Sequence, residues 1–304
     1  MSSITRRTVL YLILAAACWG LGTVISKRAI GEIPPLTLLP IQLAASLIVL
    51  ATWMRLRGLP FRDPAASPLL GRLGILNPGL AYALSLLGLA HITASVSVMV
   101  WAIEPILILL LAAIYLHERV GRLVLVLSVV AIAGMLLVVY QPGIGGSALG
   151  VLLSLAGVAC CAIYTVATRR WLASADSTAQ VVLAQEAHAL VFTAALVAGA
   201  AVLGGPGAPV GVTAAAWVSA IASGILYYAV AYGFYLSALR HVPASIAATS
   251  FYLIPVFGVA GGILFLGEQL QAVQWIGALL VLVATGAVLL RSTQPAPLRQ
   301  AVAG

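Results

Sequence analysis

Runs of about twenty apolar residues follow one another along this chain of 304 residues. A helix needs roughly 20 such residues to cross the ~30 Å hydrocarbon core of a bilayer, and a spanning segment must satisfy its own backbone hydrogen bonds. Strands of a β-barrel would alternate apolar and polar residues, and these runs do not. The sequence therefore predicts an all-α polytopic membrane protein. Its ten transmembrane helices are expected at residues 10–29, 36–54, 73–90, 94–116, 123–140, 148–168, 179–203, 213–239, 244–266 and 273–290.

The composition excludes the main soluble classes of protein. Charged residues make up 7% of the chain and hydrophobic residues 63%, whereas a typical soluble domain has about 25% charged residues. The net charge of +8 arises from few acids rather than from a cluster of bases, so no nucleic-acid partner is expected. All three cysteines lie within the expected spans. Disulfides and metal sites are therefore not expected, and a packing role is favoured.

The distribution of basic residues predicts the orientation of the helices. Thirteen of the 15 Lys and Arg residues lie at the two ends and in every second connection, and only Lys27 and Arg28 lie on the other side. Because Lys and Arg accumulate on the cytoplasmic side, both termini are expected in the cytoplasm, including a short tail at 292–304. The first run is too long for a cleavable signal peptide, so it is expected to remain a spanning helix.

The chain contains an internal repeat. A shift of 150 residues aligns 79–140 with 229–290 without a gap, and shifts of 142 and 143 align Thr23 with Thr165 and Gln42 with Gln185. The matched identities include Tyr82/Tyr232, His91/His241, Ala94/Ala244, Ser95/Ser245, Pro105/Pro255, Leu116/Leu266 and Glu118/Glu268. Two five-helix copies are expected, at 8–140 and 147–291. Because five is odd, the second copy enters the membrane from the opposite side, as in the inverted-topology repeats of many secondary transporters.

Three motifs carry a resemblance to a known family. They are Ala17-Cys18-Trp19-Gly20, then Glu104-Pro105 to Tyr115-Leu116-His117-Glu118, and in the second copy Pro255 to Phe265-Leu266-Gly267-Glu268. Over residues 8–291 the chain resembles the EamA-type repeats of the drug/metabolite transporter superfamily. Within it, the chain looks most like the YddG-type exporters of aromatic and other amino acids. One departure is His117, where the family usually has glycine.

The resemblance implies ten helices, cytoplasmic termini and export of small metabolites across a bacterial inner (plasma) membrane. It also implies a midplane cavity formed by the first, third, fourth, sixth, eighth and ninth helices.

Residues that recur in both copies are expected to serve the fold. Glu118 and Glu268 precede the fifth and tenth helices, where the helix dipole favours a carboxylate. His91 and His241 lie at the C-terminal ends of the third and eighth helices, where they can meet free carbonyls. The paired Pro105 and Pro255 are expected in the interiors of the fourth and ninth helices, where each removes one hydrogen bond. They are either tolerated kinks or a paired hinge for alternating access.

Glu104 has no counterpart, because its repeat mate is Ile254. An acid in the middle of a span costs about 2.5–3.5 kcal/mol on insertion scales, so it needs a wet cavity or a partner. Trp101, three residues earlier, shares its helix face. Glu104 is therefore predicted to line the substrate path, in an open charge state, and the alternative is a structural hydrogen bond to another helix.

The seventh helix carries a second group of polar residues, Gln185, Glu186 and His188. Gln185 and His188 are three apart and share a face, whereas Glu186 and His188 point to different faces. Together with Glu104 they are candidates for a proton or polar pathway. A structural role stays open for each.

Aromatic residues form the predicted substrate site. Tyr228, Tyr232 and Tyr235 make one stripe along the eighth helix. With Trp19, Tyr82, Trp101, Tyr164 and Tyr252 they either pack the core or line a cavity. Such a cavity would suit a substrate with an apolar side chain and an ammonium group, through cation–π contacts and hydrogen bonds.

The sequence thus predicts a secondary transporter that exports small metabolites, with aromatic or hydrophobic amino acids as the leading substrate. No cofactor is expected, and the absence of a G-x-x-x-x-G-K-[ST] run argues against an ATP-binding subunit. The chain also has no HExxH or GxSxG run of an enzyme. The alternatives are a drug or nucleotide-sugar-type transporter of the same superfamily, or a structural or receptor-like membrane protein. Proton-coupled and uncoupled export both stay open.

Overall fold

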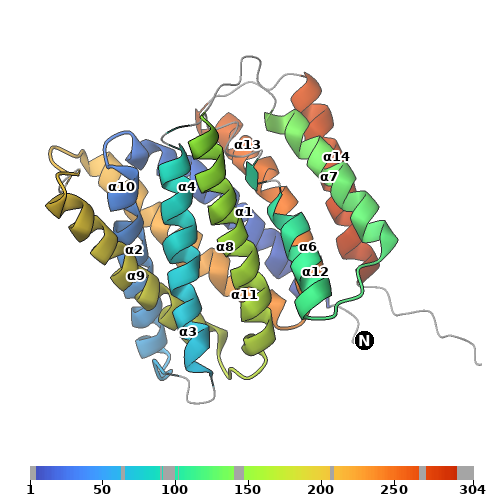
Figure 1. The fold of residues 1–304 in the computed structure, drawn as a ribbon, viewed down its shortest axis with the longest axis horizontal. Coiled ribbons are helices and arrows are strands. Elements are labelled where there is room, and N and C mark those ends of the chain that lie inside the picture. Colours follow the sequence, from blue (N-terminus) through green and yellow to red (C-terminus); the bar gives the residue numbers. More distant parts are fainter. Residues whose placement is uncertain are drawn as a thin grey trace, which may run out of the picture.

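The structure is a computed structural model that describes residues 5–62, 66–89, 91, 100–101, 103–139, 147–205, 209–266 and 272–292. This part of the chain is built from helices (Figure 1). Six of them are long and apolar enough to cross a membrane, and four shorter apolar helices accompany them within the described residues. The prediction of an all-α polytopic membrane protein with ten helices is confirmed.

The helices follow the predicted runs closely. Two of the spans contain a π-helical segment, η1 or η2, and a third contains a 3-10 segment, η3. The elements are α1 Arg6–Ile30, α2 Pro35–Leu56, α3 Pro68–Gly74, η1 Ile75–Leu80, α4 Ala81–Leu89, α6 Glu104–Tyr115, α7 Arg122–Val139, α8 Ala148–Leu172, α9 Thr178–Val202, α10 Ala214–Gly224, η2 Ile225–Val230, α11 Ala231–Leu239, α12 Ala244–Thr249, η3 Ser250–Tyr252, α13 Leu253–Leu266 and α14 Ala272–Ser292.

Local sequence explains where several helices begin. The side chains of Thr5, Ser147 and Thr213 each accept a hydrogen bond from a backbone N–H in the first turn of α1, α8 and α10. Such caps satisfy donors that have no partner inside the helix. Pro35 occupies the first position of α2, where its missing N–H costs nothing.

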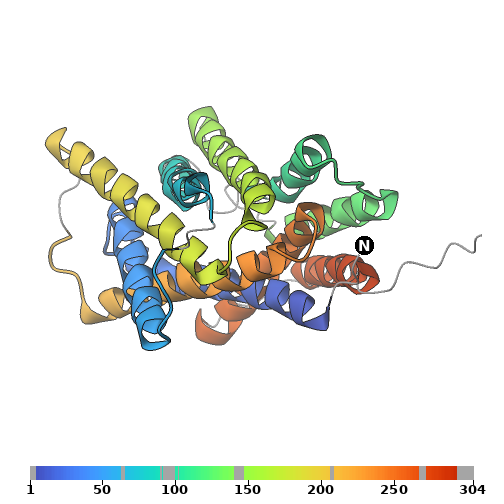
Figure 2. The same ribbon diagram turned by 90° about the horizontal axis from the view of Figure 1, so that it is seen from below.

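Helix packing follows the internal repeat. The fifth helices of the two copies, α7 and α14, pack against each other at one end of the molecule (Figures 1 and 2). The second helices, α2 and α9, pack against each other toward the other end. Further contacts come in matched pairs: α4 packs on α8 as α11 packs on α1, and α6 packs on α8 as α13 packs on α1. Each such pair joins one copy to the other.

The two π-helical segments lie at matched positions, because η1 and η2 are separated by the repeat shift of 150 residues. A glycine precedes each one. A Cβ on Gly74 would collide with the Gln185 backbone of α9, and a Cβ on Gly224 would lie 2.5 Å from the Gln42 carbonyl oxygen of α2. The third and eighth helices therefore change their winding where they cross the second helix of the opposite copy.

Pro105 lies at a helix start rather than in a helix interior, so the prediction was wrong for this proline. It occupies the first turn of α6, where the N–H groups have no partner in the helix, and proline is tolerated there without a lost hydrogen bond. Pro255 lies shortly after η3, within the continuous apolar helix Ala244–Gly258, as predicted. Both prolines mark a change of winding within the expected span.

Candidate functional site

Nine aromatic rings meet where the two copies face each other. We call this group the aromatic cluster. Its rings are linked by contacts with centroid separations of 5.0–6.3 Å. It consists of Trp19 (α1), Tyr82 (α4), Trp101, Tyr164 (α8), Tyr227 and Tyr228 (η2), Tyr232 and Tyr235 (α11) and Phe251 (η3).

Tyr232 lies at the centre of the aromatic cluster. Its ring is edge-on to Trp19 at 5.4 Å, tilted at 69° to Tyr164 at 6.3 Å, and stacked with Tyr228 at 6.2 Å. Its hydroxyl donates to the side-chain oxygen of Asn77 at 3.2 Å. Residues of both copies therefore converge on one ring.

Tyr227 belongs to the aromatic cluster, although it is not among the residues predicted for the substrate site. Its hydroxyl accepts a hydrogen bond from Tyr82 at 3.3 Å, and its ring lies 5.2 Å from Tyr228. In a regular α-helix, neighbours such as Tyr227 and Tyr228 diverge by about 100°. The π turn of η2 alters this angle, and Gly22 leaves room for the Tyr227 ring, since a Cβ there would lie 2.9 Å from it.

The sequence did contain a mark of this irregularity. Asn77 and Pro78, in the first-copy counterpart of η2, form a dipeptide typical of turns rather than of helix interiors. Asn77 has a non-helical backbone, with φ −150° and ψ 122°. Its side chain is buried and faces Tyr232.

Glu104 is the first residue of α6, with 8% of its surface exposed. Among the described residues, no side chain or backbone group donates a hydrogen bond to it within normal distance. It lies close enough to Cys161, Tyr227 and Tyr235 for electrostatic interaction. Its carboxyl group thus lies near the aromatic cluster and has no hydrogen-bond donor in the part of the chain that the structure describes.

Trp19 supplies a second unused polar group. Its ring is 4% exposed, and it makes edge contacts with Tyr232, Tyr235 and Phe251. The indole N–H has no hydrogen-bond acceptor in the described structure. An unpaired buried donor and an unpaired buried acid at one cluster are costly unless a ligand or water meets them.

Gln185 and Glu186 lie next to the aromatic cluster on α9. Gln185 accepts a hydrogen bond from the Tyr164 hydroxyl at 2.8 Å and donates one to the Leu70 carbonyl at 2.9 Å. One oxygen of Glu186 accepts a hydrogen bond from the Ser46 hydroxyl of α2 at 2.7 Å. Gln185 thus holds a tyrosine of the aromatic cluster in place, and Glu186 joins α9 to α2.

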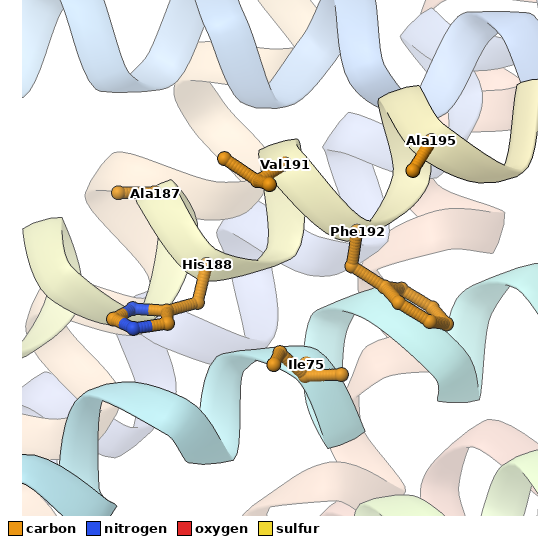
Figure 3. Close-up of a pocket in the computed structure, with 6 residues that line it drawn as sticks. All are labelled: Ile75, Ala187, His188, Val191, Phe192 and Ala195. Carbon is orange, nitrogen blue, oxygen red and sulfur yellow. The ribbon is translucent and has the colours of Figure 1, made fainter. Parts of the chain in front are cut away.

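His188 lies outside the aromatic cluster. Its side chain is exposed, and one ring nitrogen lies 2.7 Å from the Ala184 carbonyl. It lines an apolar groove of about 420 Å³ between α9 and η1, beside Ile75 and Phe192 (Figure 3). Gln185 and His188 both lie against α3, as predicted for two residues that are three apart and share a helix face. None of the predicted aromatic residues lines this groove.

Tyr252 is the predicted substrate-site residue that the structure separates from the others. It packs in a second apolar cluster with Ala16, Met135 and Val281, on the side of α7 and α14. Its neighbour Phe251 meets Trp19 and Tyr235 instead. The remaining predicted aromatic residues lie in the aromatic cluster.

Glu118 serves the fold, as predicted, but it caps a helix of the other copy rather than α7, which follows it. Its carboxylate accepts hydrogen bonds from the backbone N–H groups of Ala244 and Ser245, at the start of α12 in the other copy. The helix dipole favours this position for an acid. Glu268 lies outside the described residues. His91 and His241 follow the ends of α4 and α11, as predicted.

The described residues contain no group of three or more His, Cys, Asp and Glu side chains that could hold a metal ion. Cys18, Cys160 and Cys161 are unpaired, and Cys161 is buried beside the aromatic cluster.

Comparison with known proteins agrees with this architecture. The model of the EamA-like transporter family matches residues 6–140 and 148–290. No curated protein matches significantly. One solved crystal structure, whose description names only a protein, superimposes with a TM-score of 0.78 at 20% identity, over 94% of this chain and 97% of that one. That likeness concerns the fold. With two family matches in the order of the internal repeat, the chain belongs to the EamA-like transporter family, whose members are secondary transporters of small metabolites and drugs.

Proposed function

We propose that this protein exports aromatic and other hydrophobic amino acids across the bacterial inner membrane. The observation that carries the proposal is Glu104, a buried acid that has no hydrogen-bond donor among the described residues and lies near a cluster of aromatic rings. Ring faces and a carboxylate together form a good environment for an ammonium group on an apolar body.

Each end of an amino acid finds a matching group at the aromatic cluster. Glu104 would accept hydrogen bonds from the substrate ammonium group. The unpaired indole N–H of Trp19 would donate one to the substrate carboxylate. The rings of Tyr228 and Tyr232 would pack against the apolar side chain. A nucleotide sugar fits less well, because its phosphates call for basic groups and the aromatic cluster contains none.

Transport would proceed by alternating access around this site. The aromatic cluster joins the copies through contacts such as Trp19 with Tyr232 and Tyr82 with Tyr227. A movement of one copy against the other would open the cluster to one side of the membrane at a time. The changes of winding at Pro105 and Pro255 supply places where α6 and α13 can bend. The bias of basic residues supports cytoplasmic termini.

Counterflow uptake in proteoliposomes with a panel of amino acids tests this function. We expect aromatic and large apolar amino acids to exchange, and acidic ones not to exchange. Glu104→Gln should weaken substrate binding about 10- to 100-fold, because a hydrogen bond to a charged group contributes about 1.5–3 kcal/mol.

A matched pair of tyrosine variants locates the site. Tyr232→Phe, at the centre of the aromatic cluster, should alter the apparent substrate affinity. Tyr252→Phe, in the second apolar cluster, should leave it unchanged. Wild-type affinity in both Glu104→Gln and Tyr232→Phe would place the substrate elsewhere.

A further inference from the structure

Glu186 is a second buried acid, and it is not one of the residues proposed to contact the substrate. Its surface is 2% exposed, and it is the ninth residue of α9, a 25-residue helix long and apolar enough to cross a membrane. Only one of its two carboxyl oxygens has a partner, the Ser46 hydroxyl, and the other is buried without one. A buried carboxylate with one neutral donor is poorly stabilised, so the site favours a group that can bind a proton.

No fixed charge neutralises this carboxyl group. Among the described residues, the groups that interact with it are Ser46 on α2, Tyr164 on α8 and Tyr228 in η2. On α9 itself, the His188 side chain is exposed, whereas Glu186 is buried. Within the described residues, the charge on Glu186 is therefore balanced by a proton rather than by a neighbouring base.

The position of Glu186 connects it to the aromatic cluster. The next residue back, Gln185, holds the Tyr164 hydroxyl, and the Tyr164 ring contacts the central Tyr232. The Gln185 backbone is also where α9 meets Gly74, directly before η1. A change of charge at Glu186 would therefore act on the contacts that join α9 to both α2 and the substrate site.

We propose that Glu186 is a proton-binding site separate from the substrate site, and that it couples export to proton movement in the opposite direction. This inference rests on the proposed export function. Glu186 takes up one proton on one side of the membrane and releases it on the other, while Glu104 binds the substrate. The two acids lie on different helices, Glu104 at the start of α6 and Glu186 within α9, and the Ser46 hydroxyl of α2 donates to Glu186.

Two transport assays in proteoliposomes separate coupling from binding. Counterflow exchange needs no net proton movement, whereas accumulation driven by a pH gradient does. Glu186→Gln should keep counterflow within about twofold of the wild-type rate and lose the stimulation by the pH gradient. Ser46→Ala removes the single donor but keeps the acid, so it should keep the stimulation and shift its pH midpoint. A Glu186→Gln variant that still accumulates substrate in response to the gradient would overturn the proposal.

A measurement without substrate keeps the inference independent of the substrate assignment. Infrared difference spectra of the protein in nanodiscs, recorded along a pH titration, should show a protonated carboxyl band that is lost in Glu186→Gln and kept in Glu104→Gln. With this band present and no amino acid transported, the export proposal fails and the proton site stands. A band that does not titrate while the protein stays folded, or that survives in Glu186→Gln, refutes the proton site.

Discussion

The Glu118 carboxylate accepts two hydrogen bonds from Ser245, one from the backbone N–H at 3.0 Å and one from the hydroxyl at 2.6 Å. A third, from the Ala244 N–H, measures 2.8 Å. An acid of the first copy thereby caps a helix of the second. We expect Glu118→Ala to lower the free energy of unfolding by about 1–2 kcal/mol, the usual range for the loss of a helix cap.

Denaturant unfolding in detergent micelles measures this change. Glu118→Gln keeps one acceptor oxygen, so its free energy of unfolding should fall less than that of Glu118→Ala. Equal stability of Glu118→Ala and the wild type would mean that the cap contributes nothing.

Glu32 makes a similar cap at the start of α10, and its strength should depend on pH. Its carboxylate accepts hydrogen bonds from the Thr213 N–H at 2.7 Å and the Thr213 hydroxyl at 2.9 Å, and these two bonds lower the pKa of Glu32. Since the folded protein favours the charged form, the stabilisation is complete above the ordinary glutamate pKa of about 4.3 and is lost as the pH falls through the lowered value.

Melting temperatures of the wild type and Glu32→Gln across pH check this sign. The two should differ at neutral pH and converge in acid. A gap that stays constant down to the lowest pH would show that the carboxylate is not responsible.

Two glycines should be intolerant of a side chain. The Cβ of Gly224→Ala would lie 2.5–2.9 Å from the backbone of Gln42, and that of Gly74→Ala would collide with the backbone of Gln185. Overpacking of this kind costs about 1–3 kcal/mol, and backbone cannot yield as a flexible side chain can. We expect both variants to be less stable than the wild type by at least that amount.

Gly233→Ala is the matched control, since nothing lies within 4 Å of its Cβ and it is in the helix α11. There, alanine should stabilise the protein by about 0.5–1 kcal/mol. Thermal unfolding of the three variants compares them directly, and a tolerated Gly74→Ala would contradict the close crossing of α3 and α9.

His117 adopts a backbone conformation that suits glycine. Its φ of 52° lies in the left-handed region, which costs a residue with a Cβ about 1–2 kcal/mol. Glycine loses part of this gain through its greater freedom in the unfolded chain. His117→Gly should therefore be stabilised by about 0.5–1 kcal/mol, whereas His117→Ala, which keeps a Cβ, should show no such gain.

The apolar runs gave the helix bounds because a bilayer imposes length and backbone hydrogen bonding on every span. The same uniform hydrophobicity gave no sign of where a helix changes its winding. Apolar residues surround η2 on all sides, so no periodicity marked its π turn, and Tyr227 was missed. The role of Glu118 also could not be read from the sequence, because its partners lie 126 and 127 residues away in the other copy.

The positions of the aromatic residues show a further limit of prediction from the sequence. Tyr252 and Phe251 are neighbours in η3, yet one packs toward α14 and the other toward Trp19. Residue type alone could not distinguish them, because both satisfy the same hydrophobic demand. Glu104 could be selected as a candidate from the sequence because a lone acid in a span is expensive wherever it points.

The environment of Trp19 makes the fluorescence of the protein itself informative. The indole ring belongs to the first copy and is enclosed by rings of the second, at 4% exposure, whereas Trp53, Trp171, Trp217 and Trp275 are 36–59% exposed. Separation of the copies would hydrate this indole, together with Trp101 in the same aromatic cluster, and red-shift their emission against the nearly constant background of the four exposed tryptophans. The exchange between access states can thus be followed optically in the unlabelled protein.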